Sequence, residues 1–179
     1  MLYIDIIVQI TLRAPEFHMI VFLDTEFTSI SEQACLMSLG LAAENGELFY
    51  VEIIDGWSMA QCSDFVKEIV IPQLKPNEYA RSAFQAGLLI VDFLESLGPD
   101  VRIATDAPDF DWDFLCQLTF DVGLWPNNVS KHYLLTQNLL TEDERAAYRA
   151  EAPHHALLDA QLYVEYYKKS ILRTPEDDL

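Results

Sequence analysis

The chain has 179 residues, of which 51% are apolar, and a formal net charge of -18, so its length suits a single domain with a sizeable core. This negative charge argues against a protein that binds duplex DNA by long-range electrostatic attraction, because such proteins carry an excess of Lys and Arg. A small site whose positive charge comes from bound metal ions is not excluded. Three scattered cysteines without a C-x-x-C pair argue against a disulfide framework or a zinc site and favour reduced thiols in a cytoplasmic protein.

The two ends of the sequence differ from its middle. The stretch from Met1 to Thr11 is apolar but lacks the basic start and the small-residue cleavage site of a secretory signal. No stretch reaches the roughly 20 apolar residues that span a membrane. Because Met19 directly precedes the first predicted strand, we expect residues 1–18 to be an N-terminal extension that the fold does not need. We expect one domain over residues 19–172 and an acidic tail over residues 173–179.

The first third of the chain predicts three consecutive strands. Ile20 to Leu23 is an apolar run rich in β-branched and aromatic residues, which suits a buried strand. Residues 35–43 and 48–54 form two further apolar runs. The Asn45-Gly46 pair between them offers the two positive-φ positions that a two-residue hairpin turn favours. This pattern predicts an antiparallel meander.

Helical patterns follow the meander. A short helix is predicted over residues 63–71, where Pro72 ends it. A long helix is predicted over residues 78–97, with Asn77 as its N-cap. Its apolar stripe is expected to face the core and comprises Ala83, Phe84, Leu88, Val91 and Leu94.

The last part of the chain alternates between strand and helix signals. A strand over residues 101–104 and an amphipathic helix from Phe110 come next. Over residues 129–140 we expect a short edge strand followed by a helix. The sequence TEDE at residues 141–144 is a capping box that starts another helix, and the final helix runs to Leu172.

Two carboxylates, Asp24 and Glu26, directly follow the first apolar run. Side chains alternate between the two faces of an extended chain, so both carboxylates point the same way. Two carboxylates on one side of a core strand repel each other and lose hydration, which is tolerable only when a cation or a proton lies between them. A divalent metal ion is the obvious candidate.

Two further acidic positions carry weaker signals when taken alone. Asp111 opens the amphipathic helix, where a carboxylate is favoured near the helix N-terminus, so it is either a functional group or a helix cap. Asp159 lies between apolar residues one turn into the last helix, which is an unusual core choice unless it faces a cation; otherwise it is a surface acid. His154 and His155 precede it, and each is either functional or simply hydrogen-bonded to a neighbour.

Taken together, the three sites resemble the active-site motifs of the DnaQ-like 3′→5′ exonucleases of the DEDDh class. The motifs are D-x-E beginning at Asp24, F-D-x-x-F-L around Asp111, and H-x-A-x-x-D ending at Asp159. They occur in the family's order, and the resemblance covers nearly the whole chain, from Ile20 to Lys169.

Two details refine this resemblance. Residues 104–111 are similar to the family's A-H-N-x-x-x-[FY]-D, with Asp106 in place of the common Asn. The D-T-E-F form of the first motif further resembles small bacterial exoribonucleases within the family. The resemblance implies an α/β, ribonuclease H-like fold, whose central mixed β-sheet combines a three-strand antiparallel meander with parallel strands and is flanked by helices.

The resemblance also implies roles for individual residues. Asp24, Glu26, Asp111 and Asp159 would hold two divalent ions, Mg²⁺ or Mn²⁺, because all the ligand atoms are hard oxygens. Two such ions would stabilise the attacking and leaving oxygens of an in-line phosphodiester displacement. His154 would be the general base that takes a proton from the attacking water, which suits an imidazole with an unperturbed pKa of ~6.5. The residues implied at the substrate are Thr25, Phe27 and Asp106.

The implied reaction is the removal of nucleotides from the 3′ end of single-stranded RNA or DNA, with release of nucleoside 5′-monophosphates. The D-T-E-F variant favours RNA over DNA, and the acidic composition favours short substrates. Members of the family are often dimers, so a homodimer is a further expectation.

The choice between the two adjacent histidines depends on where the last helix begins. If the helix includes His155, that residue lies four positions before Asp159 and shares its face. The family spacing instead selects His154, five positions before Asp159, which requires His154 to lie in a loop just ahead of the helix. Pro153 makes such a loop credible, and we favour His154.

Other interpretations remain for single residues and for the whole chain. Phe27 either stacks on the terminal base or caps the core beneath the site. A phosphatase of the haloacid dehalogenase type would need D-x-D and a downstream Lys pattern, whereas the second acid here is Glu26. The main rival is a non-catalytic nucleic-acid or protein interaction module that retains the exonuclease fold.

Overall fold

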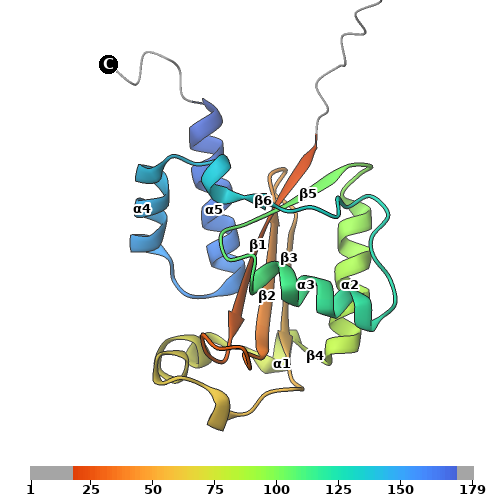
Figure 1. The fold of residues 1–179 in the computed structure, drawn as a ribbon, viewed down its shortest axis with the longest axis vertical. Helices are drawn as coiled ribbons and strands as arrows, with labels where there is room; N and C mark the ends of the chain where they lie inside the picture. Colours follow the sequence, from red (N-terminus) through yellow and green to blue (C-terminus); the bar gives the residue numbers. More distant parts are fainter. Residues whose placement is uncertain (1–17, 173–179) are drawn as a thin grey trace, which may run out of the picture.

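The computed structural model describes residues 18–172, so nearly all of the predicted N-terminal extension and the acidic tail lie outside the described residues. Within this range the chain forms a six-stranded sheet of order β4-β3-β2-β1-β5-β6, with helices on both faces (Figure 1). No helix in this range is long and apolar enough to cross a membrane. The strands are β1 (Met19–Phe27), β2 (Leu36–Ala43), β3 (Leu48–Ile53), β4 (Ala80–Arg81), β5 (Val101–Thr105) and β6 (Leu134–Leu135).

The predicted meander is confirmed, because β1 pairs antiparallel with β2, and β2 pairs antiparallel with β3. The turn between β2 and β3 differs from the expected pair of positive-φ residues. Gly46 has a φ of 99°, whereas Asn45 has a negative φ. The Gly46 N–H donates to the Ala43 carbonyl oxygen at 2.9 Å, so only the residue that ends the turn needs the left-handed conformation.

Parallel strands complete the sheet on both sides. β5 lies parallel to β1 and β6 parallel to β5, while β4 lies parallel to β3 at the other edge. The mixed sheet confirms the predicted architecture. The edge strand expected at Val129 is reduced to a single bridge with Val101. The helix expected after it is one 3₁₀ turn over Thr136–Asn138, which leaves room for β6.

The helices are α1 (Pro76–Tyr79), α2 (Ala83–Ser96), α3 (Asp111–Asp121), α4 (Glu142–Glu151) and α5 (Ala156–Leu172). The capping box predicted at the start of α4 is confirmed, with Thr141 as the N-cap and Glu144 at its third helical position. Residues 66–73 form a π-helical turn followed by a 3₁₀ turn. The predicted helix there is therefore irregular, and Pro72 lies inside its last turn.

The long helix expected over residues 78–97 is wrong, because β4 interrupts it. Ala80 and Arg81 pair with β3, and Ser82 then starts α2 with a reciprocal capping box to Gln85. Tertiary pairing and a better cap thus override the continuous helical pattern. The core face of α2 differs in part from the predicted stripe: Val91 and Leu94 are buried as predicted, and Ala83 packs against the core. Phe84 and Leu88 are exposed, and the buried side is formed by Ala86, Gly87, Ile90, Val91 and Leu94.

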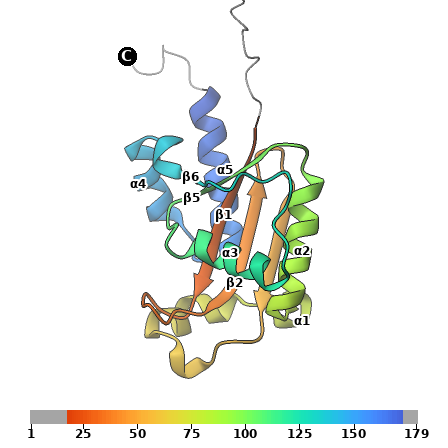
Figure 2. The same ribbon diagram turned by 45° about the vertical axis from the view of Figure 1, so that its right-hand side comes forward.

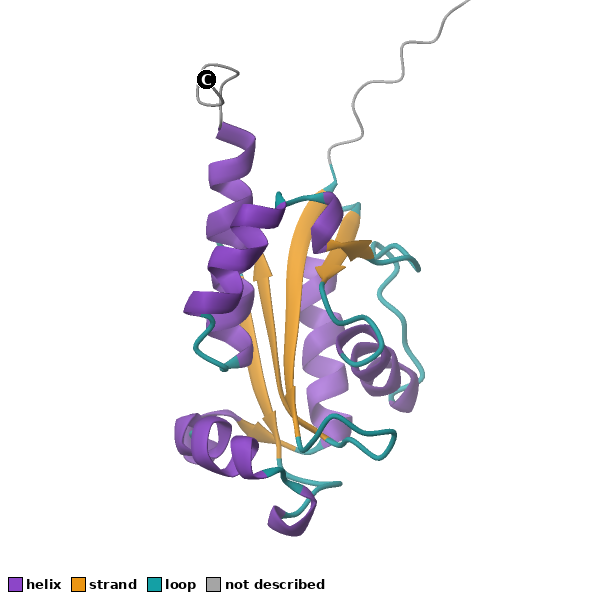
Figure 3. Cartoon of the chain, turned by 60° about the vertical axis from the view of Figure 1, so that its left-hand side comes forward, coloured by secondary structure: helices purple, strands orange, loops and turns teal. Residues whose placement is uncertain are grey.

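The two faces of β1 contact different helices, and this division positions the acidic residues. Val21 and Leu23 pack into a core with α2 and α3. Ile20 and Phe22 pack into a second core with α4 and α5. The pairs of helices on opposite faces of the sheet are visible in Figure 2 and Figure 3. Because side chains alternate, the even-numbered residues that follow, Asp24 and Glu26, continue the face toward α5.

Candidate active site

Three of the four predicted acidic ligands meet where β1 ends against the first turn of α5. Asp24 and Glu26 come from β1, and Asp159 from α5. One carboxylate oxygen from each of the three lies within 4.8 Å of the others. The structure therefore brings together residues that are more than 130 positions apart in the sequence, as the alternation of β1 requires.

Gly40 allows α5 to come this close to the sheet. It lies in β2 directly opposite Asp24, and a Cβ atom at this position would lie 2.4 Å from the backbone of Ala156. The first turn of α5 therefore rests on the bare backbone of β2, and Asp159 follows within that turn. The sequence analysis did not single out Gly40, although a glycine inside a strand often marks a close approach of another backbone.

Asp111 joins the group from the opposite helical layer. It is the first residue of α3, and its side chain is 1% exposed. Thr25 Oγ1 donates to Asp111 Oδ1 at 2.6 Å, and Thr105 Oγ1 donates to Asp111 Oδ2 at 2.5 Å. Carboxylate oxygens of Asp24, Asp106 and Asp111 also lie within 4.8 Å of one another. Asp24 therefore belongs to both acidic groups.

The threonine contacts change how Thr25 is understood. Thr25 is predicted at the substrate, and it does line the cavity; its hydroxyl holds the Asp111 carboxylate, and the residue is 5% exposed. Thr105 does the same from the end of β5. Sequence reasoning missed Thr105, because a threonine at the end of a strand is ordinary and nothing in its neighbourhood reveals the partner. Both hydroxyls fix the orientation of Asp111 toward Asp24.

Burial and mutual repulsion raise the pKa values of Asp24, Glu26, Asp111 and Asp159. Burial, followed by the charges of Asp159 and Asp111, raises the pKa of Glu26 to about 8. Burial raises the pKa of Asp111 to about 7, although the hydrogen bonds from Thr105 and Thr25 oppose the shift. The pKa of Asp159 rises to about 6, and that of Asp24 rises well above its ordinary value, in both cases mainly through burial. So many neighbouring carboxylates are stable in ionised form only with added positive charge.

One buried oxygen supports a cation as the missing partner. Asp159 Oδ2 accepts the backbone N–H of His155 at 2.7 Å. Asp159 Oδ1 is buried and has no hydrogen-bond partner among the described residues. A buried carboxylate oxygen without a partner is costly, and oxygen donors of this kind suit Mg²⁺ or Mn²⁺. The residues present therefore fit the predicted divalent ions.

His154 lies at the same cavity but outside the helix. α5 begins at Ala156, which leaves both histidines in the connection from α4. The backbone of His154 adopts a φ of 58°, and no other non-glycine residue among residues 18–172 has a positive φ. Its exposed imidazole lines the cavity that Asp24, Glu26 and Asp159 also line.

The loop that carries His154 is held by Gln73 from the 3₁₀ turn before α1. Gln73 Nε2 donates to the carbonyl oxygens of Pro153 and His154, each at 2.9 Å. The phenyl ring of Phe65 lies edge-on to the His154 ring, with the centroids 4.9 Å apart. No sequence signal marks Gln73, since its partners lie 80 and 81 positions away and are backbone atoms.

His155 points into different surroundings. Its ring stacks on Tyr50 with the centroids 4.6 Å apart, and it lines a separate cavity of about 380 Å³ with Lys75 and Tyr79. Burial lowers its pKa. His155 does not line the cavity of the acidic residues, and its backbone N–H caps Asp159 instead.

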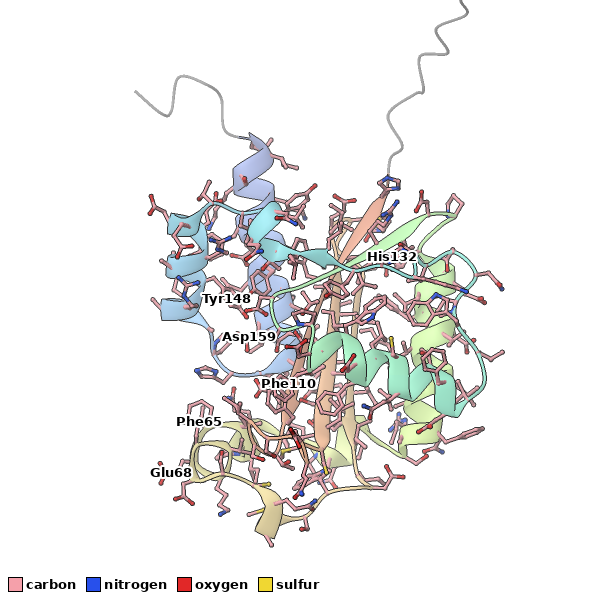
Figure 4. The ribbon with its side chains drawn as sticks, viewed as in Figure 1. Phe65, Glu68, Phe110, His132, Tyr148 and Asp159 are labelled. Atoms are coloured by element: carbon pink, nitrogen blue, oxygen red, sulfur yellow. The ribbon has the colours of Figure 1, made fainter. Side chains whose placement is uncertain are left out.

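The cavity that contains the acidic residues has a volume of about 750 Å³ and a mixed lining. Carboxylates and His154 line it together with an apolar part formed by Ile30, Phe65 and Val66. Figure 4 shows Asp159, Tyr148 and Phe65 around this region. Phe27 also reaches the cavity, but its ring stacks on Phe110 with the centroids 4.4 Å apart, so one of its faces is covered.

No family model matches the sequence, whereas individual proteins do. Two 3′-5′ exoribonucleases, from two strains of Mycobacterium tuberculosis, are each 29% identical to this chain over 165 residues. The match covers 88% of this chain and 94% of each relative.

Solved structures show the same fold at lower identity. Exonuclease I matches with a TM-score of 0.60 and 13% identity over 89% of this chain, which spans only 42% of that protein. Cell-death related nuclease 4 and a full-length 3′-exonuclease each match with a TM-score of 0.55 over 87% of this chain, and the matches cover 64% and 82% of those proteins. Their identities to this chain are 14% and 16%.

The relatives and the fold are those of exonucleases, in agreement with the resemblance of the three short motifs to the DnaQ-like family. The similarity covers 88% of this chain for the exoribonucleases and 89% for exonuclease I.

Proposed function

We propose that this protein is a metal-dependent 3′→5′ exonuclease that removes nucleotides from the 3′ end of a single-stranded nucleic acid. It prefers RNA to DNA and releases nucleoside 5′-monophosphates. The observation that carries the proposal is the convergence of Asp24, Glu26, Asp111 and Asp159 with His154 on one open cavity. The similarity to the 3′-5′ exoribonucleases of Mycobacterium tuberculosis supports both the direction of cleavage and the preference for RNA.

The four carboxylates would hold two divalent ions. Asp24 is shared between the two acidic groups, with Glu26 and Asp159 on one side and Asp111 on the other. Bound Mg²⁺ or Mn²⁺ would supply the positive charge that stabilises the attacking and leaving oxygens of an in-line phosphodiester displacement. The raised pKa values of Glu26 and Asp111 mean that protons would have to leave when an ion binds.

His154 would take a proton from the attacking water through a ring nitrogen. Its imidazole is exposed at the mouth of the cavity, so water reaches it, and the unperturbed pKa of histidine suits a general base near neutral pH. Gln73 would fix the loop that sets the position of this ring. Thr25 and Thr105 would keep the Asp111 carboxylate ionised and correctly oriented, since both donate to it.

The apolar part of the cavity lining would contact the bases of a single strand. Ile30 is 87% exposed and Phe65 is 50% exposed, although both are large apolar residues. Unpaired bases have free faces that pack on such side chains, whereas the bases of a duplex are stacked on each other. The exposed ring of Phe65 is better placed for this contact than that of Phe27, one face of which is covered by Phe110.

The test is cleavage of matched single-stranded RNA and DNA oligonucleotides labelled at the 5′ end, with Mg²⁺, with Mn²⁺ and with EDTA. We expect a ladder that shortens from the 3′ end, more quickly for RNA, and only with a divalent ion. Asp24→Asn should lower the rate by at least about 10³-fold, because charge stabilisation by the ions contributes several kcal/mol. Circular dichroism and thermal unfolding should show that the variant stays folded.

The same assay separates the enzyme from a non-catalytic interaction module. Absence of cleavage of both RNA and DNA with either ion would favour the module and reject the enzyme. Equal rates on RNA and DNA would reject only the substrate preference. Analytical ultracentrifugation would test the predicted homodimer.

A further inference from the structure

A second cavity adjoins the acidic one on the side of α4. Its volume is about 320 Å³, and its lining includes Thr136, Gln137 and Arg145. Asp106, Tyr148 and Arg149 line both cavities, so the two are neighbours. The second cavity contains none of the proposed metal ligands and plays no part in the proposed chemistry.

Two arginines supply the positive charge of this cavity, whose lining also includes the carboxylates of Asp106 and Glu142. Of the Lys and Arg residues in the described part of the chain, only Arg145 and Arg149 line either cavity. They lie one turn apart on α4. This is unusual for a protein with a net charge of -18, because the available positive charge is scarce and two of its carriers lie beside the acidic site.

Glu142 holds both guanidinium groups in place. Arg149 Nη2 donates to Glu142 Oε1 at 2.8 Å, and Arg145 Nη2 donates to Glu142 Oε2. Two guanidinium charges and one carboxylate leave this group with a net charge of +1. Each guanidinium has five N–H donors, so most of its donors are free to bind an anion.

The helix that carries the arginines is fixed against the active-site layer. Tyr148 lies between them in sequence, is buried, and stacks on Tyr163 of α5 with the ring centroids 3.7 Å apart. α4 therefore keeps a set position relative to α5, which also carries Asp159. The distance between the arginines and the acidic group is consequently constrained by the core rather than by a loop (Figure 1).

We infer that Arg145 and Arg149 bind a phosphate of the substrate strand on the 5′ side of the scissile bond. The inference rests on the proposed function. A single strand whose scissile phosphate lies at the carboxylates must place its next phosphates somewhere on the surface, and phosphates favour guanidinium groups because of their paired donors. The arginine cavity is next to the proposed active site and supplies those donors, while Glu142 keeps them oriented.

The first experiment measures binding and cleavage by Arg149→Gln, Arg145→Gln and the double variant of the full chain. The probe is a 5′-fluorescent single-stranded RNA of six nucleotides, with fluorescence anisotropy in Ca²⁺ for binding and Mg²⁺ for cleavage. We expect each single variant to weaken binding and raise KM about tenfold, as loss of a charge-assisted hydrogen bond predicts, with kcat unchanged. The slope of log K against log salt should become shallower by about 0.7 per lost phosphate contact.

A matched control and a modified substrate make this test specific. Arg81→Gln, on the edge strand β4, removes the same charge from a residue that lines neither cavity, and it should leave KM unchanged. An otherwise identical oligonucleotide with one neutral methylphosphonate linkage, moved stepwise from the 3′ end, should bind wild-type protein about tenfold more weakly at one position. At that position Arg149→Gln should cause no further loss.

Each outcome decides between the proposals. If Arg149→Gln and Arg145→Gln behave like Arg81→Gln while wild-type protein still cleaves, the arginine site is rejected and the proposed function stands. If wild-type protein never cleaves but binds the oligonucleotide through Arg149, the phosphate site stands and the enzyme is rejected. Failure of the wild-type protein to bind any of the oligonucleotides overturns the arginine site together with its premise.

Discussion

Two neighbouring histidines lie on opposite sides of the connection into α5, and their surroundings differ sharply. His154 is exposed at an acidic cavity and lies on a loop held by Gln73. His155 is half-buried, stacks on Tyr50 and lines another cavity. The same residue type one position apart thus meets water and carboxylates in one case and an aromatic ring in the other.

The start of α5 produces this difference. Because the helix begins at Ala156, His155 occupies the position that caps it and His154 precedes it with a left-handed backbone. Had the helix begun earlier, His155 would share a face with Asp159, four residues later. A shift of one or two residues in the start of α5 therefore decides which histidine reaches the acidic residues. Sequence patterns predict the ends of helices poorly at this level of detail.

The largest expected effect separates the two histidines directly. His154→Ala should lower the cleavage rate by about 10²–10⁴-fold, the usual contribution of a general base, with little change in stability because the side chain is exposed. His155→Ala is the matched variant, and it should retain cleavage while losing stability through the stacking contact with Tyr50. Cleavage rates and thermal unfolding of both variants check this. Loss of cleavage in His155→Ala alone would reverse the assignment.

The next prediction concerns Gly40, on which the first turn of α5, directly after both histidines, packs. Gly40→Ala should destabilise the fold by about 1–3 kcal/mol, as overpacking does, because the new Cβ would meet the backbone of Ala156. Cleavage should fall as well, since Asp159 moves with the helix. Gly87→Ala is the control, because its Cβ would meet the backbone of Leu118 on the other face of the sheet.

Chemical denaturation and cleavage under folding conditions distinguish the two glycines. Both variants should lose stability, but only Gly40→Ala should also lose activity per folded molecule. Equal activity in the two folded variants would mean that the first turn of α5 need not rest on β2 for the site to work.

A smaller effect should follow from releasing the loop of His154. Gln73→Leu removes the two hydrogen bonds to the carbonyl oxygens of Pro153 and His154, and we expect kcat to fall about tenfold with KM nearly unchanged. In a His154→Ala background the same substitution should have no further effect on kcat. Steady-state kinetics of the double-mutant cycle measure this coupling. Additive losses would show that Gln73 acts on something other than His154.

The last prediction concerns stability alone, in its response to pH without metal. Glu26 keeps its proton up to about pH 8 in the folded chain, whereas an ordinary glutamate loses it near 4.5. The folded state therefore binds more protons than the unfolded state between these values, and stability falls as the pH rises through that window. Because one proton of difference is worth about 1.4 kcal/mol per pH unit, we expect a loss of about 2 kcal/mol between pH 6 and pH 8, or about 4–8 °C in Tm.

Scanning calorimetry in EDTA from pH 6 to pH 8 measures this slope, and Mn²⁺ should restore the lost stability at pH 8 because it binds the ionised carboxylates. Glu26→Gln should flatten the slope, while His155→Ala should keep it. If the slope of stability against pH is unchanged in Glu26→Gln, the protons are bound by a group other than Glu26.

Much of the fold and of the candidate site follows from local patterns. The apolar runs of β1 to β3, the capping box at Thr141 and the alternation that aligns Asp24 with Glu26 depend on residues close together in the sequence. The break between α1 and α2 was missed because it depends on pairing of Ala80 and Arg81 with β3. Local helical periodicity contains no information about that distant strand.

The supporting residues of the site were missed for the same physical reason. Thr105, Gln73 and Gly40 act through partners that are distant or are backbone atoms, and neither kind of partner leaves a mark in the surrounding sequence. Charged residues were easier to find, because an ionisable group in an apolar segment requires an explanation by itself. Residues that only orient the ionisable groups, such as threonine and glycine, are common in apolar segments and need no such explanation.

The left-handed backbone at His154 also has a consequence for the energy of the whole protein. A non-glycine residue in that conformation costs about 1–2 kcal/mol, a sizeable part of the 5–15 kcal/mol by which typical domains are stable. Glycine would adopt the observed φ of 58° without that cost, yet it offers no imidazole. At position 154, therefore, glycine would give higher stability and histidine gives the functional side chain, and the chain cannot have both.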